Sequence, residues 1–575
     1  MHNEDVIGGP GGPLGAQINK ALPTNANRLR NLIHGANHLM SHILHFYHLV
    51  ALDYVSPRVV LAGIPTPLNR PFLCPRYDEN HYITTQRILA IAGIPGAITP
   101  ACLTTLSSLP GWGAPGNDPG GAVNAYLTGQ YLKALDMRRM CHEMLAIFAG
   151  RAAICSGFTP GGITATITQK TIDQYRALLN KVIAFIGAPT DFATGTAGTM
   201  MFDTVAAAHL FPEYFWIGQT YSQFMAYGVF ENGFKNGISN IFGGQPTTDN
   251  RGLRRGYKLS AQLGATRYDV DMMKIKESVG YSRYSKDALR NYPDGIPFKH
   301  PWDGITGPDP YADNAVPNGY SWLKSPRYDI GSGNYQPFEV GPLARQVVEG
   351  NYYAGVLNAL GYALTPTWNQ NGPNISASGT HPLKAVYALI PGVTGGPNLS
   401  GVQYKGDSTL DRIAARTVET LVIALLMNKY LNQIQNTLSG GYGASGCTEP
   451  DVPISGTETK GYGMTEASRG ALGHWIKMQN GEVTRYQCIV PTTWNANPRD
   501  VLGQEGPAER SLQGDGAVPH PTVPLAAAGS TWVADPNEPI ELPRVTHSYD
   551  FCIACAVHLI SPKGKIIKVD IPALP

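Results

Sequence analysis

A long helix-forming segment in the second half of the chain constrains the fold more than any other feature. It covers residues 408–438, opens with Ser408 followed three residues later by Asp411, and stops at Gly440-Gly441. The opening has the pattern of an N-terminal capping box, and glycine is a common end of a helix. We predict a single helix over these residues, at the centre of a helix-rich protein.

Weaker patterns give the rest of the architecture. Three further segments are predicted to be helical: 25–52, 130–148 and 171–185. Residues 225–335 have weak periodicity and favour irregular β and loop structure, whereas 470–500 contain short strands at 475–478 and 484–490. Residues 1–20 are rich in glycine and proline and are predicted to be a loop. We expect a predominantly helical, multi-region α+β fold with a central long-helix bundle and small peripheral β-sheets.

Composition excludes several classes of protein. Charged residues make up 15% of the 575, below the roughly 25% of an average soluble protein. This indicates that much surface is buried against a partner. The net charge is +2 and no basic run stands out, so nothing favours binding to nucleic acid or to an anionic membrane. Eight cysteines are too few for a disulfide scaffold. The first residues do not form a signal peptide, and the longest apolar run, 421–427, is too short to span a membrane.

Two thiols and an imidazole near the C-terminus form a compact group of soft metal ligands. They are Cys552, Cys555 and His558, at three-residue spacing, and a polar, basic tail of 17 residues (559–575) follows. One CxxC pair is also compatible with a redox pair, half of a zinc site or two buried thiols. A structural zinc site would need two more ligands, and no second CxxC is present. The pattern therefore favours metal binding.

A row of histidines marks the first predicted helix. Steps of four, four, three and three residues keep all five on one helix face. They are His34, His38, His42, His45 and His48. A row of metal ligands is one interpretation; a polar seam packed against a partner or a cofactor edge is the one we favour.

A further pair, Arg469-Gly470, stands at the start of a predicted strand, where the arginine could lie close to a buried centre.

Taken together, these segments resemble the large subunit of nickel–iron hydrogenases of the uptake type. The resemblance covers about residues 20–575. Its marks also include the sequences at 160–162, 300–304, 320–328, 339–345 and 491–494. It implies a domain over residues 21–558, a catalysed reaction H2 ⇌ 2 H⁺ + 2 e⁻ by heterolytic cleavage, and transfer of the electrons to an iron–sulfur small subunit.

The resemblance also implies the ligands of a nickel–iron centre with CO and cyanide on iron. Cys552 would be a terminal nickel thiolate and Cys555 a thiolate bridging nickel and iron, which suits soft metal ions. Arg469, held by Asp550, would place its guanidinium over the open position to polarise H2 or accept its proton. His558 would ligate a buried Mg²⁺.

Three other expectations follow from the same resemblance. Pro491 and Thr492 would line the pocket of the diatomic ligands, with the Thr492 hydroxyl donating to a cyanide, and the Cys488 carbonyl could also ligate the Mg²⁺. A maturation endopeptidase would remove residues 559–575 after nickel-insertion factors have acted. The complex would lie at the membrane or on its periplasmic side through a signal on the small subunit, in contact with a membrane cytochrome; a cytoplasmic location is the alternative.

The chain also departs from the pattern of this family. Members supply two more nickel ligands from an N-terminal CxxC with a nearby histidine, whereas the first cysteine here is Cys74. We expect a truncated or mis-started chain; a separate N-terminal polypeptide and an inactive, scaffold-like relative are the alternatives. In addition, Phe551 stands where proline is usual, and Ser41 where many members carry an acid.

Overall fold

The computed structural model describes most of the helical and strand segments of the chain. The described residues are 24–55, 119–152, 155–159, 162–187, 199–211, 214, 217–230, 253–261, 265–284, 298–304, 319–349, 406–439, 456–513, 541–552, 559–560 and 566–567. The predicted loop at 1–20 and the predicted ligands Cys555 and His558 lie outside them. The helices and small sheets expected from the sequence are both present.

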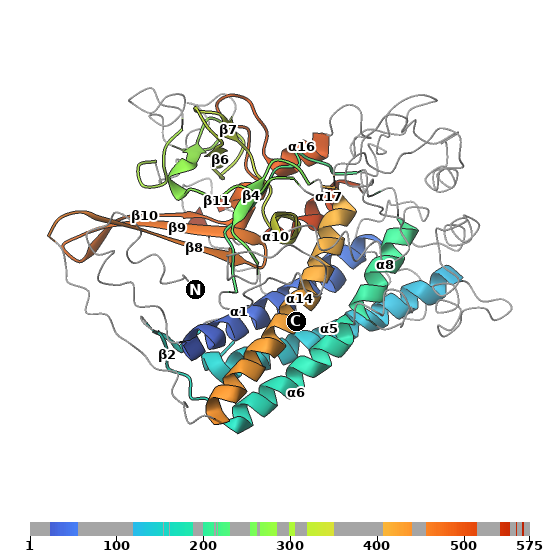
Figure 1. Cartoon of the computed structure of the whole chain (residues 1–575). Coiled ribbons are helices and arrows are strands. Elements are labelled where there is room, and N and C mark those ends of the chain that lie inside the picture. Colours follow the sequence, from blue (N-terminus) through green and yellow to red (C-terminus); the bar gives the residue numbers. More distant parts are fainter. Residues whose placement is uncertain are drawn as a thin grey trace.

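Four long helices lie together in the lower half of Figure 1. They are α1 (Thr24–Leu44), α5 (Pro119–Ala149), α6 (Gln169–Ile186) and α14 (Thr409–Ser439). Helix α1 packs against α5 and α14, and α6 packs against the same two helices. Five shorter helices also lie in the described part: α8 (Met200–Leu210), α10 (Pro342–Glu349), α15 (Pro491–Asn495), α16 (Pro507–Gln513) and α17 (Glu541–Ser548).

The ends of these helices test the sequence patterns. At the start of α14 the Asp411 carboxylate accepts from the Ser408 N–H (2.9 Å) and the Ser408 hydroxyl accepts from the Asp411 N–H (3.3 Å), which confirms the predicted capping box. Helix α5 begins at Pro119 instead of residue 130. The first predicted helix keeps its extent, but after α1 it continues as the π-helix η2 (His45–Val50) and the 3-10 helix η3 (Ala51–Asp53).

Helices α1 and α14 approach each other closely at Gly35. A β-carbon at this position would lie 2.6 Å from the Met427 sulfur and 2.7 Å from its Cγ. Only glycine allows this approach without a shift of the methionine. The short separation brings polar side chains of the two helices, such as His42 and Glu419, within hydrogen-bonding distance.

Among the described residues, the sheet with the longest strands is an antiparallel three-stranded sheet in the order β10-β9-β8. It contains β8 (Thr459–Ala467), β9 (Gly470–Gln479) and β10 (Glu482–Ile489). The strand predicted at 475–478 lies in β9, and the strand predicted at 484–490 matches β10 as far as residue 489. Strand β8 was not predicted. Smaller sheets pair β1 (Phe158–Thr159) with β2 (Gly162–Ile163), β3 (Phe224–Ala226) with β4 (Gly256–Lys258), β11 (Leu559–Ile560) with β12 (Ile566–Ile567), and β5 (Ile275–Ser278) with β6 (Ser325–Asp329) and β7 (Tyr335–Gln336).

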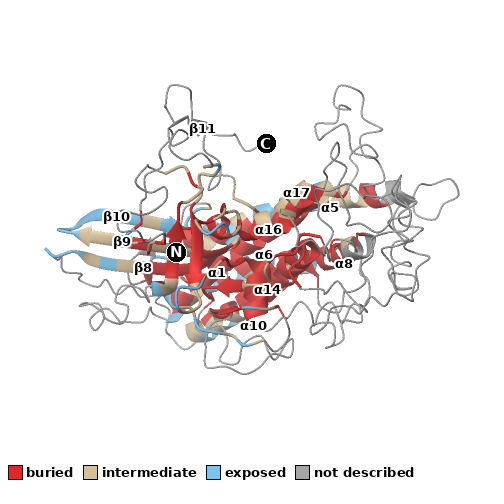
Figure 2. Ribbon diagram, turned by 90° about the horizontal axis from the view of Figure 1, so that it is seen from above, coloured by how far each residue is buried: buried red, intermediate tan, exposed pale blue. Residues whose placement is uncertain are grey.

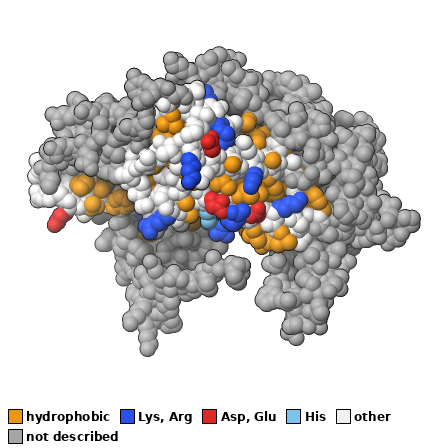
Figure 3. Space-filling view, turned by 90° about the horizontal axis from the view of Figure 1, so that it is seen from below, with side chains coloured by type: hydrophobic (Ala, Val, Ile, Leu, Met, Phe, Trp, Pro, Cys, Tyr) orange, Lys and Arg blue, Asp and Glu red, His pale blue; other side chains and the backbone are white. Residues whose placement is uncertain are grey.

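The buried side chains of the described residues form two apolar clusters. One joins the long helices, and the other lies under the small sheets around Trp475 and Trp494. Figure 2 shows that α1 and α14 are largely buried and that the far ends of β8, β9 and β10 are exposed. On the face drawn in Figure 3, basic side chains of the described residues are interspersed with acidic and hydrophobic ones.

Candidate active site

The predicted site residues come from three segments that are distant in sequence. Arg469 lies in the turn between β8 and β9, Pro491 is the first residue of α15, and Asp550 follows the end of α17. The turn is fixed by Gly470, which has a φ of 137° and sits against the backbone of residues 340 and 341. A β-carbon there would lie 2.7 Å from the Val340 side chain, so this turn requires glycine after the arginine.

Arg469 is paired with Asp550 through several hydrogen bonds. Its Nε donates to the carboxylate Oδ1 (3.1 Å) and to the backbone carbonyl (3.0 Å) of Asp550, and its Nη2 lies 3.0 Å from Oδ1. Asp550 is buried and has a φ of 60°, a left-handed conformation that aspartate tolerates better than most residues. Burial alone would raise the pKa of Asp550. The nearby His45, Arg416 and Arg469 side chains lower it by more than burial raises it, so the net shift is downward and the carboxylate is ionised.

A second arginine holds the other oxygen of the same carboxylate. Arg416 of α14 donates from Nη1 to Oδ2 of Asp550 at 3.2 Å. The Arg416 side chain is 2% exposed, and burial lowers its pKa to about 10, which leaves it charged at neutral pH. Asp550 therefore lies between two guanidinium groups, one for each oxygen.

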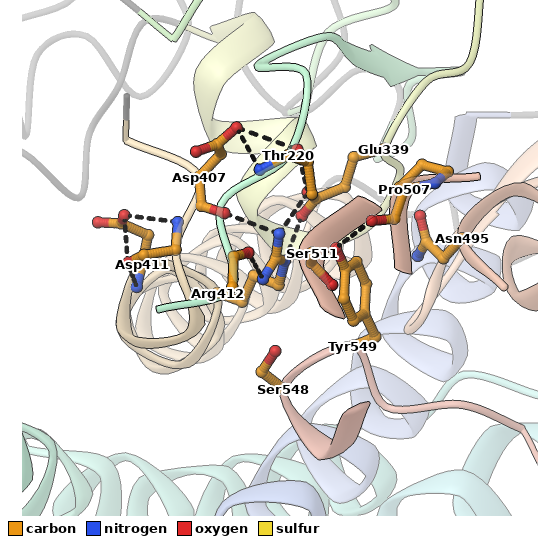
Figure 4. Close-up of polar contacts among 12 residues, drawn as sticks. Thr220, Glu339, Asp407, Asp411, Arg412, Asn495, Pro507, Ser511, Ser548 and Tyr549 are labelled. Carbon is orange, nitrogen blue, oxygen red and sulfur yellow. Dashed lines mark hydrogen bonds and ion pairs between the residues drawn. The ribbon is translucent and has the colours of Figure 1, made fainter. Parts of the chain in front are cut away.

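The residue before Asp550 is also held by α14 (Figure 4). The guanidinium carbon of Arg412 lies 4.0 Å from the centre of the Tyr549 ring, and the Tyr549 hydroxyl donates to the Pro507 carbonyl at 3.2 Å. Arg412 and Arg416 are one helical turn apart, so they share a face of α14. This face fixes Tyr549 and Asp550 in succession.

Arg412 is itself held in a buried polar network. Its guanidinium donates to both carboxylate oxygens of Glu339, at 2.8 and 2.9 Å, and to the Asp407 carbonyl at 2.7 Å. One carboxylate oxygen of Asp407 in turn accepts from the backbone and hydroxyl of Thr220 and of Ser222. These contacts join the start of α14 to the loop before β3, as Figure 4 shows for Thr220, Glu339 and Asp407.

Cys552 lies two residues beyond Asp550 and contacts α15. Its backbone N–H donates to the Thr492 hydroxyl oxygen at 3.1 Å. A hydroxyl that accepts a hydrogen bond still carries its own proton, so Thr492 can donate elsewhere. Pro491 and Thr492 are both buried, and Cys552 is partly buried. The structure thus places Arg469, Asp550, Pro491, Thr492 and Cys552 in joined segments.

The donor chemistry of this site fits a nickel–iron group, although the described residues do not complete it. Cys552 would supply a soft thiolate, the ligand type that such metals take. Within the described ranges, no group of three or more histidine, cysteine, aspartate or glutamate side chains could hold a metal ion. The two other predicted ligands, Cys555 and His558, lie outside those ranges.

The histidine row is a seam inside the chain itself. The ring Nε2 of His34 donates to the Glu466 carbonyl at 2.7 Å, and the ring of His45 donates to the His547 carbonyl at 2.6 Å. The Nε2 of His42 contacts the Glu419 carboxylate at 2.9 Å. The predicted polar seam is present, but its contacts are with β8, α14 and α17 because these elements cover α1 on this side.

The buried histidines predict acid sensitivity of the fold. Burial lowers the pKa of His34 to about 3 and that of His42 to about 4, and it lowers the pKa of His38 well below its usual value. Below pH 6.5 the unfolded chain therefore binds protons that the folded chain does not. Each histidine then removes about 1.4 kcal/mol of stability per pH unit between its unfolded and folded pKa. We expect the free energy of unfolding, measured in urea, to fall steeply from pH 6.5 to pH 5, and a flat profile would contradict this.

Sequence reasoning did not find Arg412 or Arg416 as parts of the site. The sequence did hold a signal for them, because arginines four residues apart share one face of a predicted helix that also contains a long apolar run. Buried arginines need acidic partners. The identity of those partners depends on contacts between distant segments, which the sequence does not show.

Comparison with known proteins gives the family. The family model for nickel-dependent hydrogenases matches residues 15–558. The chain belongs to the nickel-dependent hydrogenase family. It is 32% identical to the periplasmic NiFeSe hydrogenase large subunit of Desulfomicrobium baculatum, over 94% of this chain and 79% of that one. It is 29% identical to the hydrogenase-2 large chain of Escherichia coli K12, over 96% of this chain and 86% of that one.

A solved structure and a further sequence relative agree with this assignment. A reduced, active form of the Ni-Fe-Se hydrogenase from Desulfomicrobium baculatum matches with a TM-score of 0.61 and 28% identity, over 97% of this chain and 85% of that chain. An uptake hydrogenase large subunit of Rhizobium leguminosarum is 29% identical, over 95% of this chain and 82% of its own length. The chain is therefore a hydrogenase large subunit, an oxidoreductase with a nickel–iron centre. None of the described helices is long and apolar enough to cross a membrane.

Proposed function

We propose that this chain oxidises H2 by heterolytic cleavage, H2 → 2 H⁺ + 2 e⁻, as the large subunit of an uptake hydrogenase. The observation that carries the proposal is the Arg469–Asp550 pair two residues before Cys552. A buried, ionised carboxylate there orients a partly exposed guanidinium. This is the arrangement required to present N–H groups to a small molecule in the site.

Cys552 and Cys555 would hold nickel and iron, with CO and cyanide on the iron. His558, together with the Cys488 carbonyl, would hold Mg²⁺. When bound, the nickel–iron group supplies soft metal ions at which H2 is polarised. The three-residue spacing of the two thiols lets both reach one centre, and Cys488 lies at the end of β10, next to α15.

The protein residues then have distinct tasks. Arg469 presents its planar guanidinium to the open side of the site, where its N–H groups polarise H2. Asp550 holds this guanidinium in place, and Pro491 forms a wall of the pocket. Thr492 fixes the backbone of Cys552 through its hydroxyl oxygen and has a proton left to donate to a cyanide.

The relatives are named large subunits or large chains, so we propose that this chain also works in a complex with a small subunit. A small subunit with iron–sulfur clusters would take the electrons, and a membrane cytochrome would accept them from it. Nickel-insertion factors would load the site, and a maturation endopeptidase would then remove residues 559–575. We place the complex at the membrane or on its periplasmic side, as in the periplasmic relative.

The proposed activity is tested by H2-dependent dye reduction. The chain is produced with its small subunit and maturation factors, and reduction of a viologen dye under H2 is followed. We expect activity in the wild type and none in Cys552→Ala, because the thiolate ligand is removed. Cys141→Ala is the matched control, since this buried thiol lies in α5. Equal rates in wild type and Cys552→Ala would contradict the proposal.

A further inference from the structure

Arg469 is held at two places by groups that belong to one buried network. Its side chain is held by Asp550, as described above. Its backbone is held one residue earlier, because Arg345 of α10 donates from Nη2 to the Ser468 carbonyl and from Nη1 to the Ala467 carbonyl, both at 3.0 Å. Arg345 thus fixes the turn from which Arg469 extends.

Arg345 connects this turn to α14 and β8. Its Nε donates to the Glu419 carboxylate at 2.8 Å, and its Nη1 donates to the Glu466 carboxylate at 2.7 Å. All three side chains are fully buried. Burial raises the pKa of Glu419, but Arg345 and His42 lower it to a net value of about 2, so the carboxylate is ionised.

His42 of α1 links Glu419 to the arginine that holds Asp550. Arg416 faces the Nδ1 of His42 at 3.5 Å, and the opposite ring nitrogen contacts Glu419 at 2.9 Å. Because an arginine can only donate, Nδ1 is the acceptor and Nε2 carries the proton. His42 is therefore a neutral bridge between a guanidinium and a carboxylate.

These contacts close into a ring that begins and ends at Arg469. In order, its members are Arg469, Asp550, Arg416, His42, Glu419, Arg345 and the carbonyls before Arg469. With Glu466 included, the ring has three arginine and three acidic side chains, and each acidic side chain contacts an arginine. Buried charges are tolerated when they are paired in this way.

We propose that this ring positions Arg469 and that Arg416 and His42 are its positioning residues. The ring spans α1, α10, α14 and the β8–β9 turn, which are separate elements of the fold. A break at one member would free the Asp550 carboxylate to turn and so release the Arg469 side chain. The relevance to catalysis rests on the proposed function, whereas the positioning itself does not need the metal.

Reactivity of Arg469 toward phenylglyoxal tests the ring. The reagent attacks accessible guanidinium groups, and the Arg469 side chain is 36% exposed while those of Arg345 and Arg416 are buried. The full chain is treated briefly, and modification of each arginine is quantified by mass spectrometry of its peptides. In Arg416→Met we expect Arg469 to react about tenfold faster, the factor that corresponds to loss of one charge-assisted hydrogen bond.

Two variants of His42 and one distant arginine complete the test. His42→Leu removes no charge but breaks the ring, so Arg469 should react faster there too. His42→Gln can accept from Arg416 and donate to Glu419, so its rate should return toward wild type. Arg176→Met is the matched control, because Arg176 also contacts α14 through three hydrogen bonds, to Asn428, Asn432 and Gln435, but lies outside the ring.

The labelling rates test the ring, and the hydrogenase activity tests the proposed function, so the two claims can fail independently. Unchanged reactivity of Arg469 in both Arg416→Met and His42→Leu, relative to Arg176→Met, would overturn the ring, as would equal rates in His42→Gln and His42→Leu. A wild type without hydrogenase activity would instead remove the proposed function, while the labelling rates would still decide the ring.

Discussion

Replacement of Arg345 by methionine should destabilise the protein by about 3–5 kcal/mol, the range for removal of one partner from a buried ion pair. Arg345 is fully buried and donates to Glu419, Glu466 and two backbone carbonyls. Methionine fills part of the volume but leaves two carboxylates facing each other without a cation. The free energy of unfolding, measured in urea at neutral pH, should fall by this amount.

The matched control for this variant is Arg139→Met. Arg139 also contacts two carboxylates, those of Asp136 and Glu143, but all three lie exposed on α5. Water and salt screen such pairs, so the control should unfold as the wild type does. Equal stabilities of the two variants would show that the Arg345 network is not a stabilising element of this fold.

The second large effect is on turnover in Arg469→Lys. We expect the rate of H2-dependent dye reduction to fall by about 100-fold, the scale for losing one preorganised donor at a reacting centre. A lysine ammonium keeps the charge but cannot contact Asp550 through the planar fork and face the site at once. Nickel content should stay at the wild-type level, because Arg469 is not a metal ligand.

Asp550→Asn serves as the companion variant for this prediction. An amide oxygen keeps one hydrogen bond to Arg469, but the charge that orients two guanidinium groups is lost. Turnover should fall in this variant as well, with nickel retained. A rate for Arg469→Lys close to that of the wild type would remove this arginine from the mechanism.

The fold could be predicted best where a pattern is local. The capping box of α14 was correct because Ser408 and Asp411 are three residues apart and satisfy each other. Strand β8 was missed, since its glycine, tyrosine and threonine residues are held by pairing with β9 and not by an alternating pattern of their own. The change to a π-helix at His45 likewise has no local signal in the sequence.

The residues of the candidate site also fall into a group that the sequence predicted and a group that it did not. Arg469, Asp550 and Cys552 were found through a family resemblance, and the structure places all three in joined segments. The roles of Arg345 and Arg416 were not predicted, because they depend on partners in β8 and after α17 that only the tertiary structure brings near. The histidine row shows the same limit: its face was predicted, but its partners were not.

Metal analysis of the purified complex tests the central claim most directly. The chain is produced with its small subunit and the maturation factors, and nickel and iron are quantified by mass spectrometry, with iron of the small subunit subtracted. The account predicts about one nickel and one iron per large subunit, in line with a soft thiolate centre, and loss of both metals in Cys552→Ala. A metal-free wild-type chain that still binds its small subunit would contradict the account and leave a scaffold subunit with a hydrogenase fold.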